Sequence, residues 1–549
     1  MFVRALQRLS AAGRVNLAIV VVFWLVMLNR ALEASTRFAG LVASRNAVLA
    51  ARDEPVDERL APGWMWAGSV QDQSDHQWWA FKKELGTLVL LLAVFLAGGR
   101  AMRSAGASLH ARLAYSLLFA VGFSAHAFGS GGLWVWLLAA LNYAAARALA
   151  GTRHYPVLLW LVNLAILIRI NAIARYDPIQ LCPEAVCTQT VHDLLSGSVD
   201  WSVYYKLVFL RLISFGMDLH WKRCETAPAA TAGRPPLFRA QETPLDADAY
   251  TAPFFFAYLF YIPLFIAGPV VTFNAFVAQF ATPRQVTTAG AAARMAARIV
   301  AVILLLEFWT HCFYQYMMNE DRWYFDDGTG MLGVDVFFLG LLTVTFMYMK
   351  FLTIWRFFRL AACIDGIDST VNLKACVHNT DSFAMFWRIW HASFANWIQR
   401  YLYRPLGGPS TRTMTIWPIF LFVGTWHEPS PGWMAWALMN ALGMSVETVV
   451  TAKFGKSPFW MAAPVYEISQ AVASILRLSA QLAIMNAFST TGLMLRIMLL
   501  SDPISMPLVL LYFGAITSFL RAFAAERADA RKAEREAALQ LAGSDRAAP

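Results

Sequence analysis

Charged residues are scarce in this sequence, and their scarcity excludes an ordinary soluble protein. Only 15% of the 549 residues are Asp, Glu, Lys or Arg, whereas a soluble domain carries about 25%. Hydrophobic residues make up 58%, and the mean hydropathy is +0.48. The apolar residues form runs that are too long for core strands. The sequence therefore predicts an all-α polytopic membrane protein with no soluble domain of useful size.

Cysteine is also rare, and its spacing excludes the common zinc motifs. The six cysteines include no CxxC pair and no set with zinc-ligand spacing, so no metal site is expected. Cys182 and Cys187 lie close together in an acidic segment that is expected to face the lumen. In an oxidising lumen they could form a small disulfide, and otherwise they are two free thiols. The sequence leaves both readings open.

Two further signals are missing, a signal-peptide cleavage site and a nucleic-acid-binding motif. The apolar run Val15–Leu28 leads into Asn29-Arg30 instead of small residues, so it is expected to be the first membrane helix. The net charge of +10 and the pI of about 9.4 would suggest nucleic acid in a soluble chain. Here the basic residues flank apolar runs, as the positive-inside rule requires. The expected partner is therefore the lipid bilayer and not nucleic acid.

Long apolar runs predict about 11–12 transmembrane helices, with one or two re-entrant segments among them. After the first helix, the expected spans lie near residues 85–98, 113–128, 133–149, 155–174, 201–219, 295–316, 331–354, 433–450, 465–487 and 503–522. The polar, tryptophan-rich segment 34–82 is expected in the lumen and the N-terminus in the cytosol. Residues 523–549 are expected to form a charged cytosolic tail.

The apolar segment Phe254–Phe273 is interrupted midway by Pro263 and by the pair Gly268-Pro269. Within a membrane, a broken helix is tolerated only where protein or water satisfies the freed backbone groups. We therefore expect this segment to line a cavity inside the protein and not to face lipid.

The segment FWRIWHASFANWIQRYLYRPLGG (Phe386–Gly408) is too charged for a membrane span and too aromatic for an ordinary loop. It predicts an amphipathic or re-entrant helix that stops at the proline and paired glycines of residues 405–408. Arg400 and Arg404 lie one helical turn apart and form a cationic pair suited to phosphate. Simple anchoring at the membrane interface is the alternative explanation for this composition.

His427 follows the apolar run Ile416–Trp426, where an imidazole is costly unless it has a partner or a task. The next residues, EPSPG, end the helix at once, so the histidine should face a cavity or a surface instead of lipid. A neutral imidazole there is a competent general base. A histidine that only packs is the alternative. A second histidine, His391, lies 36 positions earlier in similarly apolar sequence.

The two motifs WHASFANWIQRYLYRPLGG and FVGTWHEPSPGWMAWALMN together resemble the paired signature of the membrane-bound O-acyltransferase (MBOAT) family. The similar branch is that of the glycerol uptake (Gup) proteins and the Hedgehog acyltransferases, and Leu210–Trp221 and Tyr261–Phe276 are also similar to Gup segments. The resemblance implies an MBOAT fold with a central intramembrane cavity. It implies N-terminal transmembrane helices with lumenal loops in 1–200, a catalytic core in 201–450 and C-terminal transmembrane helices in 451–522.

The resemblance also implies roles for particular residues. The essential histidine of the family maps onto His427, and the polar residue of the first motif maps onto His391. Many members have glycine after the essential histidine, whereas this chain has Glu428, which either orients the imidazole or only marks the lineage. The co-substrate implied is acyl-CoA, with no other cofactor and no metal. The residues expected to bind substrate are Arg388, Trp390, Asn396, Arg400, Arg404, Trp426 and Asn440.

The implied reaction moves an acyl chain from acyl-CoA to a lipid hydroxyl, with His427 as the base and His391 holding the acceptor or the thioester carbonyl. The acceptor implied by the Gup branch is a lyso-glycosylphosphatidylinositol (lyso-GPI) or a lysophospholipid, in the endoplasmic reticulum membrane. Acylation of a secretory protein, glycerol or proton transport, and a non-catalytic scaffold are the alternatives. A transport path could use Arg169, Asp218, Glu307, Asp335 and Lys350, but the sequence lacks the inverted repeat typical of transporters.

Overall fold

The computed structural model describes residues 11–172, 195–226 except 198, 236–321, 323, 329, 331–454 except 381, and 505–516 except 506 and 513. Within these residues the regular elements are helices and one two-stranded hairpin, which confirms the all-α class. The Cys182 and Cys187 pair, the span expected at 465–487 and the tail expected at 523–549 lie outside the described residues.

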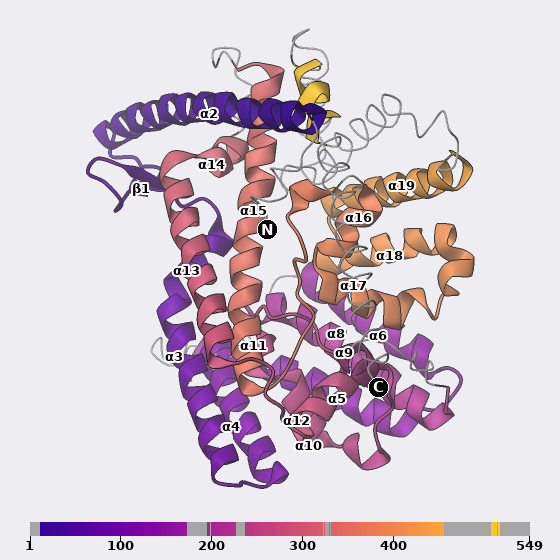
Figure 1. Cartoon of the computed structure of the whole chain (residues 1–549). Helices are drawn as coiled ribbons and strands as arrows, with labels where there is room; N and C mark the ends of the chain where they lie inside the picture. Colours follow the sequence, from indigo (N-terminus) through magenta and orange to yellow (C-terminus); the bar gives the residue numbers. More distant parts are fainter. Residues whose placement is uncertain are drawn as a thin grey trace, which may run out of the picture.

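The N-terminal part of the described chain contains long helices and the hairpin (Figure 1). Its elements are α2 (Ala11–Ala51), β1 (Leu60–Pro62), β2 (Val70–Asp72), α3 (His76–Ser104), α4 (Leu109–Phe128), α5 (Gly132–Leu149) and α6 (Tyr155–Ala172). The two strands pair antiparallel, with Ala61 opposite Gln71. Asp75 caps the start of α3 by accepting a hydrogen bond of 2.7 Å from the backbone N–H of Trp78.

The rest of the described chain alternates long helices with short ones. The middle elements are α8 (Trp201–Cys224), α9 (Pro236–Glu242), α10 (Ala252–Leu259), α11 (Ile262–Phe265), α12 (Phe273–Ala281), α13 (Ala289–Cys312), α14 (Gln315–Glu320) and α15 (Gly333–Asp365). The last elements are α16 (Phe383–Ile389), α17 (Ala392–Ile398), a π-helical turn (Gln399–Tyr403), α18 (Arg412–His427) and α19 (Pro431–Phe454). In Figure 1, α3, α13 and α15 run side by side, and α16 to α19 form a separate group beside them.

Five helical segments of the described chain are long and apolar enough to cross a membrane, and they confirm a polytopic protein. They are Arg14–Ala51, His76–Ser104, Leu109–Leu149, Ala289–Cys312 and Gly333–Asp365. Large side chains such as Leu90 and Leu118 stay 65% and 74% exposed, as expected of surfaces that face lipid. α15 differs, because 78% of its most apolar window is buried among other helices. It is therefore the central helix of this bundle.

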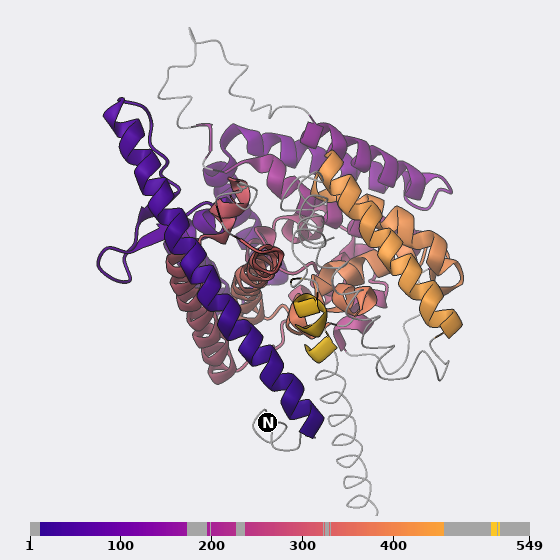
Figure 2. The same cartoon turned by 90° about the horizontal axis from the view of Figure 1, so that it is seen from above.

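The structure differs from the sequence prediction at α2. The expected first span, Val15–Leu28, is only the first half of a continuous helix that runs on to Ala51, into the segment predicted as a lumenal loop. Figures 1 and 2 show that α2 crosses the ends of α13 and α15 and does not run parallel to them. A single helix can continue here because the residues after Leu28 contain neither glycine nor proline until Gly40.

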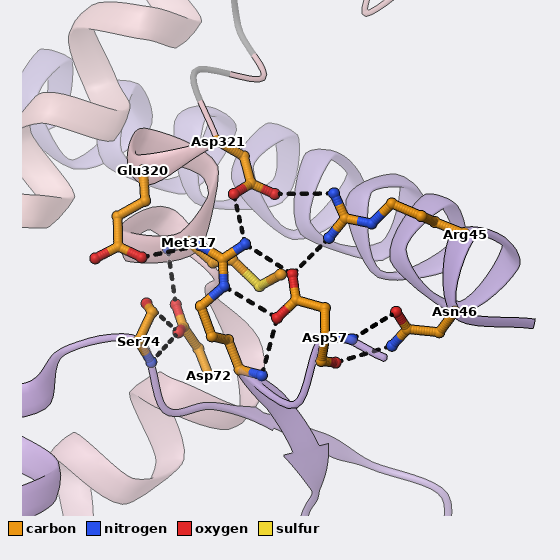
Figure 3. A network of polar contacts seen from close by, with 9 residues as sticks. Arg45, Asn46, Asp57, Asp72, Ser74, Met317, Glu320 and Asp321 are labelled. Carbon is orange, nitrogen blue, oxygen red and sulfur yellow. Dashed lines mark hydrogen bonds and ion pairs between the residues drawn. The ribbon is translucent and has the colours of Figure 1, made fainter. Parts of the chain in front are cut away.

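A polar network holds the C-terminal end of α2 (Figure 3). The guanidinium of Arg59 donates to Asp57, Asp321 and Glu320 at 2.7, 2.6 and 3.0 Å, and Arg45 on α2 donates to the same Asp57 carboxylate at 2.5 Å. The bonds from Arg59 hold the pKa of Asp57 below its ordinary value. The network thus ties α2, the segment before β1 and the end of α14 together.

The expected break in Phe254–Phe273 is confirmed. α10 ends at Leu259, α11 covers only Ile262–Phe265, and the next helix begins at Phe273. The carbonyls freed by the break accept hydrogen bonds from Arg211 of α8, whose guanidinium donates to the carbonyl oxygens of Tyr258, Leu259 and Leu264 at 3.0, 2.5 and 2.7 Å. A buried arginine therefore replaces the missing helical hydrogen bonds.

Candidate active site

His391 lies at a break between two short helices, whereas the sequence predicted one helix through Phe386–Gly408. Its backbone has φ 47° and ψ 46°, the left-handed region that residues with a side chain rarely adopt. The turn is held by Asn372, which accepts a hydrogen bond of 2.9 Å from the N–H of Ala392 and one of 3.1 Å from the N–H of Ser393. Backbone strain that the surroundings enforce in this way is typical of functional positions.

α16, which leads to His391, is fixed at its start by α19. Ser382 accepts a hydrogen bond of 3.1 Å from the backbone N–H of Met385, and this is the usual capping geometry. Glu447 of α19 accepts hydrogen bonds from the N–H groups of Phe383 and Ala384 at 2.6 and 3.2 Å. A carboxylate at this end of a helix is favourable. The position of His391 is therefore set from both sides.

The ring of His391 lies among aromatic side chains. Its centroid is 4.6 Å from that of Trp355, 5.2 Å from that of Phe394 and 6.4 Å from that of Trp426. The Nδ1 atom is buried and forms no hydrogen bond with the described part of the chain. Most buried polar atoms in proteins have a partner, so this nitrogen is a candidate for contact with a substrate.

His427 is the last residue of α18, as the sequence predicted. Its ring stacks on Trp433 with centroids 4.3 Å apart and an interplanar angle of 7°, and Trp426 and Trp436 meet it edge-on at 4.8 and 6.1 Å. Within the described residues, its ring nitrogens have no hydrogen bond. Glu428 continues in an extended conformation and donates its N–H to the carbonyl of Gly424.

Both histidine rings lie beside the indole ring of Trp426. The Trp426 ring lies 4.8 Å from His427 and 6.4 Å from His391, centroid to centroid. Trp426 itself is fixed by α8, because its Nε1 donates a hydrogen bond of 2.8 Å to the carbonyl of Lys206. Side chains 36 positions apart in the sequence thus share one aromatic environment.

The three arginines expected at the phosphates of acyl-CoA have different surroundings. Arg400 is 4% exposed and forms an ion pair of 2.9 Å with the buried Asp218. Arg404 pairs with Glu242 at 2.8 Å. The expected cationic pair is therefore already neutralised by carboxylates from α8 and α9. Arg388 is exposed on α16, and within the described residues it has no ion pair.

The remaining predicted residues lie around the histidines in two ways. Trp390 contacts Trp355, at a centroid distance of 5.7 Å, directly beside His391. Asn396 donates to Thr370 at 3.1 Å, and the fully buried Asn440 donates to the carbonyl of Trp436 at 2.9 Å. Asn396 therefore bonds a side-chain hydroxyl and Asn440 a backbone carbonyl, and Trp390 is part of the aromatic side chains around His391.

Sequence reasoning missed Lys206 on α8. Its Nζ donates a hydrogen bond to the backbone carbonyl of His427. The available signal was a lysine inside the apolar run expected as a span at 201–219, since an ionisable group at such a position suggests function.

Comparison with known proteins identifies the family to which the chain is similar. The sequence model of the membrane-bound O-acyltransferase family matches residues 186–515. The chain is 28% identical over 403 residues to the membrane-bound O-acyltransferase gup1 of Schizosaccharomyces pombe, covering 70% of this chain and 67% of that protein. It is 26% identical to the membrane-bound O-acyltransferase GUP1 of Saccharomyces cerevisiae, and the match covers 72% of this chain and 71% of that protein. It is 28% identical to the mouse protein-cysteine N-palmitoyltransferase HHAT, and that match covers 45% of this chain and 49% of the mouse protein. These matches confirm the resemblance to the family, and the chain belongs to the membrane-bound O-acyltransferase family.

Proposed function

We propose that this acyltransferase moves a fatty acyl chain from acyl-CoA to the hydroxyl of a membrane lysolipid, with His427 as the general base. The observation that carries the proposal is the environment of His427. Three tryptophans hold its ring at the end of α18, while its ring nitrogens have no hydrogen bond within the described chain. A general base needs such a nitrogen, held in place and still able to accept a proton.

The proposed reaction uses no nucleophilic side chain. His427 takes the proton of the acceptor hydroxyl while the hydroxyl oxygen attacks the thioester carbonyl carbon. The new C–O bond forms, the C–S bond breaks, and CoA leaves as a thiolate that takes the proton back from the imidazolium. His391 donates a hydrogen bond to the developing oxyanion or to the acceptor, a role for which its unbonded Nδ1 is suited.

We assign contact with the CoA phosphates to Arg388, because Arg400 and Arg404 are already paired with carboxylates. Trp390 and Trp426 then line the place where the acyl chain meets the histidines. Asn396 and Asn440 support this wall through Thr370 and Trp436.

The acceptor that we propose is lyso-GPI in the endoplasmic reticulum membrane, with a lysophospholipid as the related substrate. The support is the resemblance to the Gup branch together with the similarity to the two yeast GUP1 acyltransferases. Acylation of a secretory protein is the second candidate, and the match to mouse HHAT favours it.

Transport loses its main support in the described structure, because the acidic and basic residues that could line a solute path have ion-pair partners. The pairs are Asp218 with Arg400 (2.9 Å), Glu307 with Lys82 (3.1 Å), Asp335 with Arg30 (2.5 Å) and Lys350 with Asp75 (2.6 Å). Four of the five residues proposed for a transport path therefore form ion pairs that join different parts of the chain. Within the described residues, only Arg169 forms no such pair.

The experiment compares microsomes that carry the wild type, His427→Ala or His126→Ala, each supplied with labelled acyl-CoA and either lyso-GPI or lysophosphatidylinositol. His126 is an exposed histidine on α4, away from the site, and serves as the matched control. We expect label in the lipid with the wild type and His126→Ala, and a loss of about 10²–10⁴-fold with His427→Ala.

The same microsomes also show which acceptor the enzyme uses. If the wild type acylates neither lipid but acylates secretory peptides in a His427-dependent manner, the protein acceptor replaces the lipid. If labelled glycerol crosses the membrane equally with wild type and His427→Ala and no acylation occurs on any acceptor, the transporter interpretation holds instead.

A further inference from the structure

Lys206 and the end of α18 are joined by two hydrogen bonds that run in opposite directions. The Lys206 Nζ donates to the backbone carbonyl of His427, and the Trp426 Nε1 donates to the backbone carbonyl of Lys206 at 2.8 Å. One residue of α8 thereby holds both of the last two residues of α18.

The carbonyl that Lys206 binds is one that the helix itself cannot satisfy. The last carbonyls of an α-helix have no intrahelical partner, and the negative end of the helix dipole lies there. At the end of α18 the N–H of Glu428 donates a hydrogen bond to the carbonyl of Gly424, and the backbone then becomes extended. A hydrogen bond from an ammonium group to this carbonyl is stronger than one from a neutral donor. Lys206 therefore fixes the backbone from which the His427 ring projects.

Within the described residues, the His427 carbonyl is the hydrogen-bond acceptor of the Lys206 ammonium group. Lys206 is half-buried, and it lies between Val203, which is 53% exposed, and the completely buried residues Val208, Phe209 and Leu210. The carboxylates of Glu428 and Asp200 interact with Lys206 electrostatically. The carboxylate of the same helix, Asp218, pairs instead with Arg400. Burial of part of this side chain is unfavourable unless specific partners hold the ammonium group, and the hydrogen bond to the His427 carbonyl is such a contact.

We propose that Lys206 is a positioning residue for acyl transfer, which acts by holding the main chain of His427 so that the imidazole meets the acceptor hydroxyl. The proposal rests on the function proposed for His427. Lys206 contacts the backbone carbonyl of His427 and not the imidazole ring. Removal of the Lys206 ammonium group should therefore affect the rate of the chemical step more than the binding of acyl-CoA.

The test measures kcat and KM for acyl-CoA in purified wild type, Lys206→Met, Lys206→Arg and Lys222→Met. Methionine keeps the length of the side chain without the donor, and arginine keeps a cationic donor. Lys222 lies on the last turn of the same helix and serves as the matched control. We expect kcat to fall roughly 10- to 100-fold in Lys206→Met with KM within about twofold of the wild type. Arginine should restore most of the rate, and Lys222→Met should match the wild type.

A double variant separates positioning from general damage. If Lys206 acts only through His427, adding Lys206→Met to His427→Ala should cause no further loss of the residual rate. A further loss of similar size to that in the single variant would overturn the proposal. So would a wild-type kcat in Lys206→Met, or an equal loss in the Met and Arg variants accompanied by a raised KM.

Failure of this inference can be told apart from failure of the proposed function. If His427→Ala keeps the wild-type rate, the proposed function itself is wrong. If His427→Ala is inactive and Lys206→Met is not impaired, only the role of Lys206 is wrong. Should Lys206→Met not fold, judged by thermal unfolding in detergent, Trp426→Phe tests the same connection. It removes the return hydrogen bond and should lower kcat in the same direction by a smaller factor, and an unchanged kcat would count against the proposal.

Discussion

The buried ion pairs around α2, α3 and α15 differ from the surroundings of the two histidine rings between α16 and α19. In the first region, Lys350 lies opposite Asp75 at 2.6 Å and Arg59 bridges Asp57 and Asp321. In the second, the rings of His391 and His427 are surrounded by aromatic side chains and make no hydrogen bond within the described residues. Paired groups stabilise a fold, whereas nitrogens held in place without a partner are available to a substrate.

The sharpest test of this comparison is the replacement of His427 by alanine. We expect acyl transfer to fall about 10²–10⁴-fold, because the general base is lost. Thermal stability should fall by no more than the packing that the ring makes with the three tryptophans, because no hydrogen bond of the ring is lost. The measurement is labelled acyl transfer together with thermal unfolding in detergent. An inactive variant that is also strongly destabilised would mean that the ring is a packing group.

The opposite result is expected for Lys350→Ala on α15. Removing one member of a buried ion pair leaves Asp75 uncompensated and should cost about 3–5 kcal/mol of stability. The specific activity of the protein that remains folded should be unchanged, since the pair is not in contact with either histidine. Combining Lys350→Met with Asp75→Asn removes both charges and should recover part of the stability. Loss of activity without loss of stability would break the comparison.

A smaller effect on stability is expected for Arg59→Met, with a defined dependence on pH. The lowered pKa of Asp57 means that its ion pair stabilises the fold above the ordinary pKa of 3.8 and is lost as the pH falls through the lowered value. Arg59→Met should cost about 1–2 kcal/mol near neutral pH and less in acid. Thermal unfolding measured from about pH 7 to about pH 3 checks this. An equal cost at both ends of the range would exclude the network as its source.

The smallest effect is expected for Arg388→Ala. Loss of one exposed contact with the CoA phosphates should raise KM for acyl-CoA about two- to fivefold and leave kcat unchanged. Arg412→Ala, which removes an arginine at the start of α18, is the control and should leave KM as it is. If neither variant changes KM, the head group is held by other residues.

The sequence alone predicts the class of the protein and two local features that the structure confirms, a helix break and a helix end. Proline and glycine mark the break in Phe254–Phe273, and a histidine at the end of an apolar run marks His427, because both signals are local. The partner of Arg400 could not be predicted in this way. Asp218 lies 182 positions earlier, and only the packing of α8 against the π-helical turn brings the two together.

The left-handed turn at His391 and the direction of α2 were missed for the same kind of reason. The sequence around His391 contains no glycine or proline, so local propensity predicts a continuous helix. The turn is held by Asn372 from a neighbouring segment. The direction of α2 likewise depends on the ion pairs of Arg45 with Asp57 and Asp321, and a single sequence does not show that Asp321 lies beside this helix.

The hydrogen bonds from Arg211 to three backbone carbonyls have a consequence for the assembly of the protein. α8 leaves the ribosome before α10 and α11, and an arginine without partners in the bilayer is unfavourable by several kcal/mol. The guanidinium finds its acceptors only when the segment near Tyr258 and Leu264 has arrived. The buried position of Arg211 is therefore stable only once α8 and the broken segment have packed together, so these two parts of the chain should assemble as one unit.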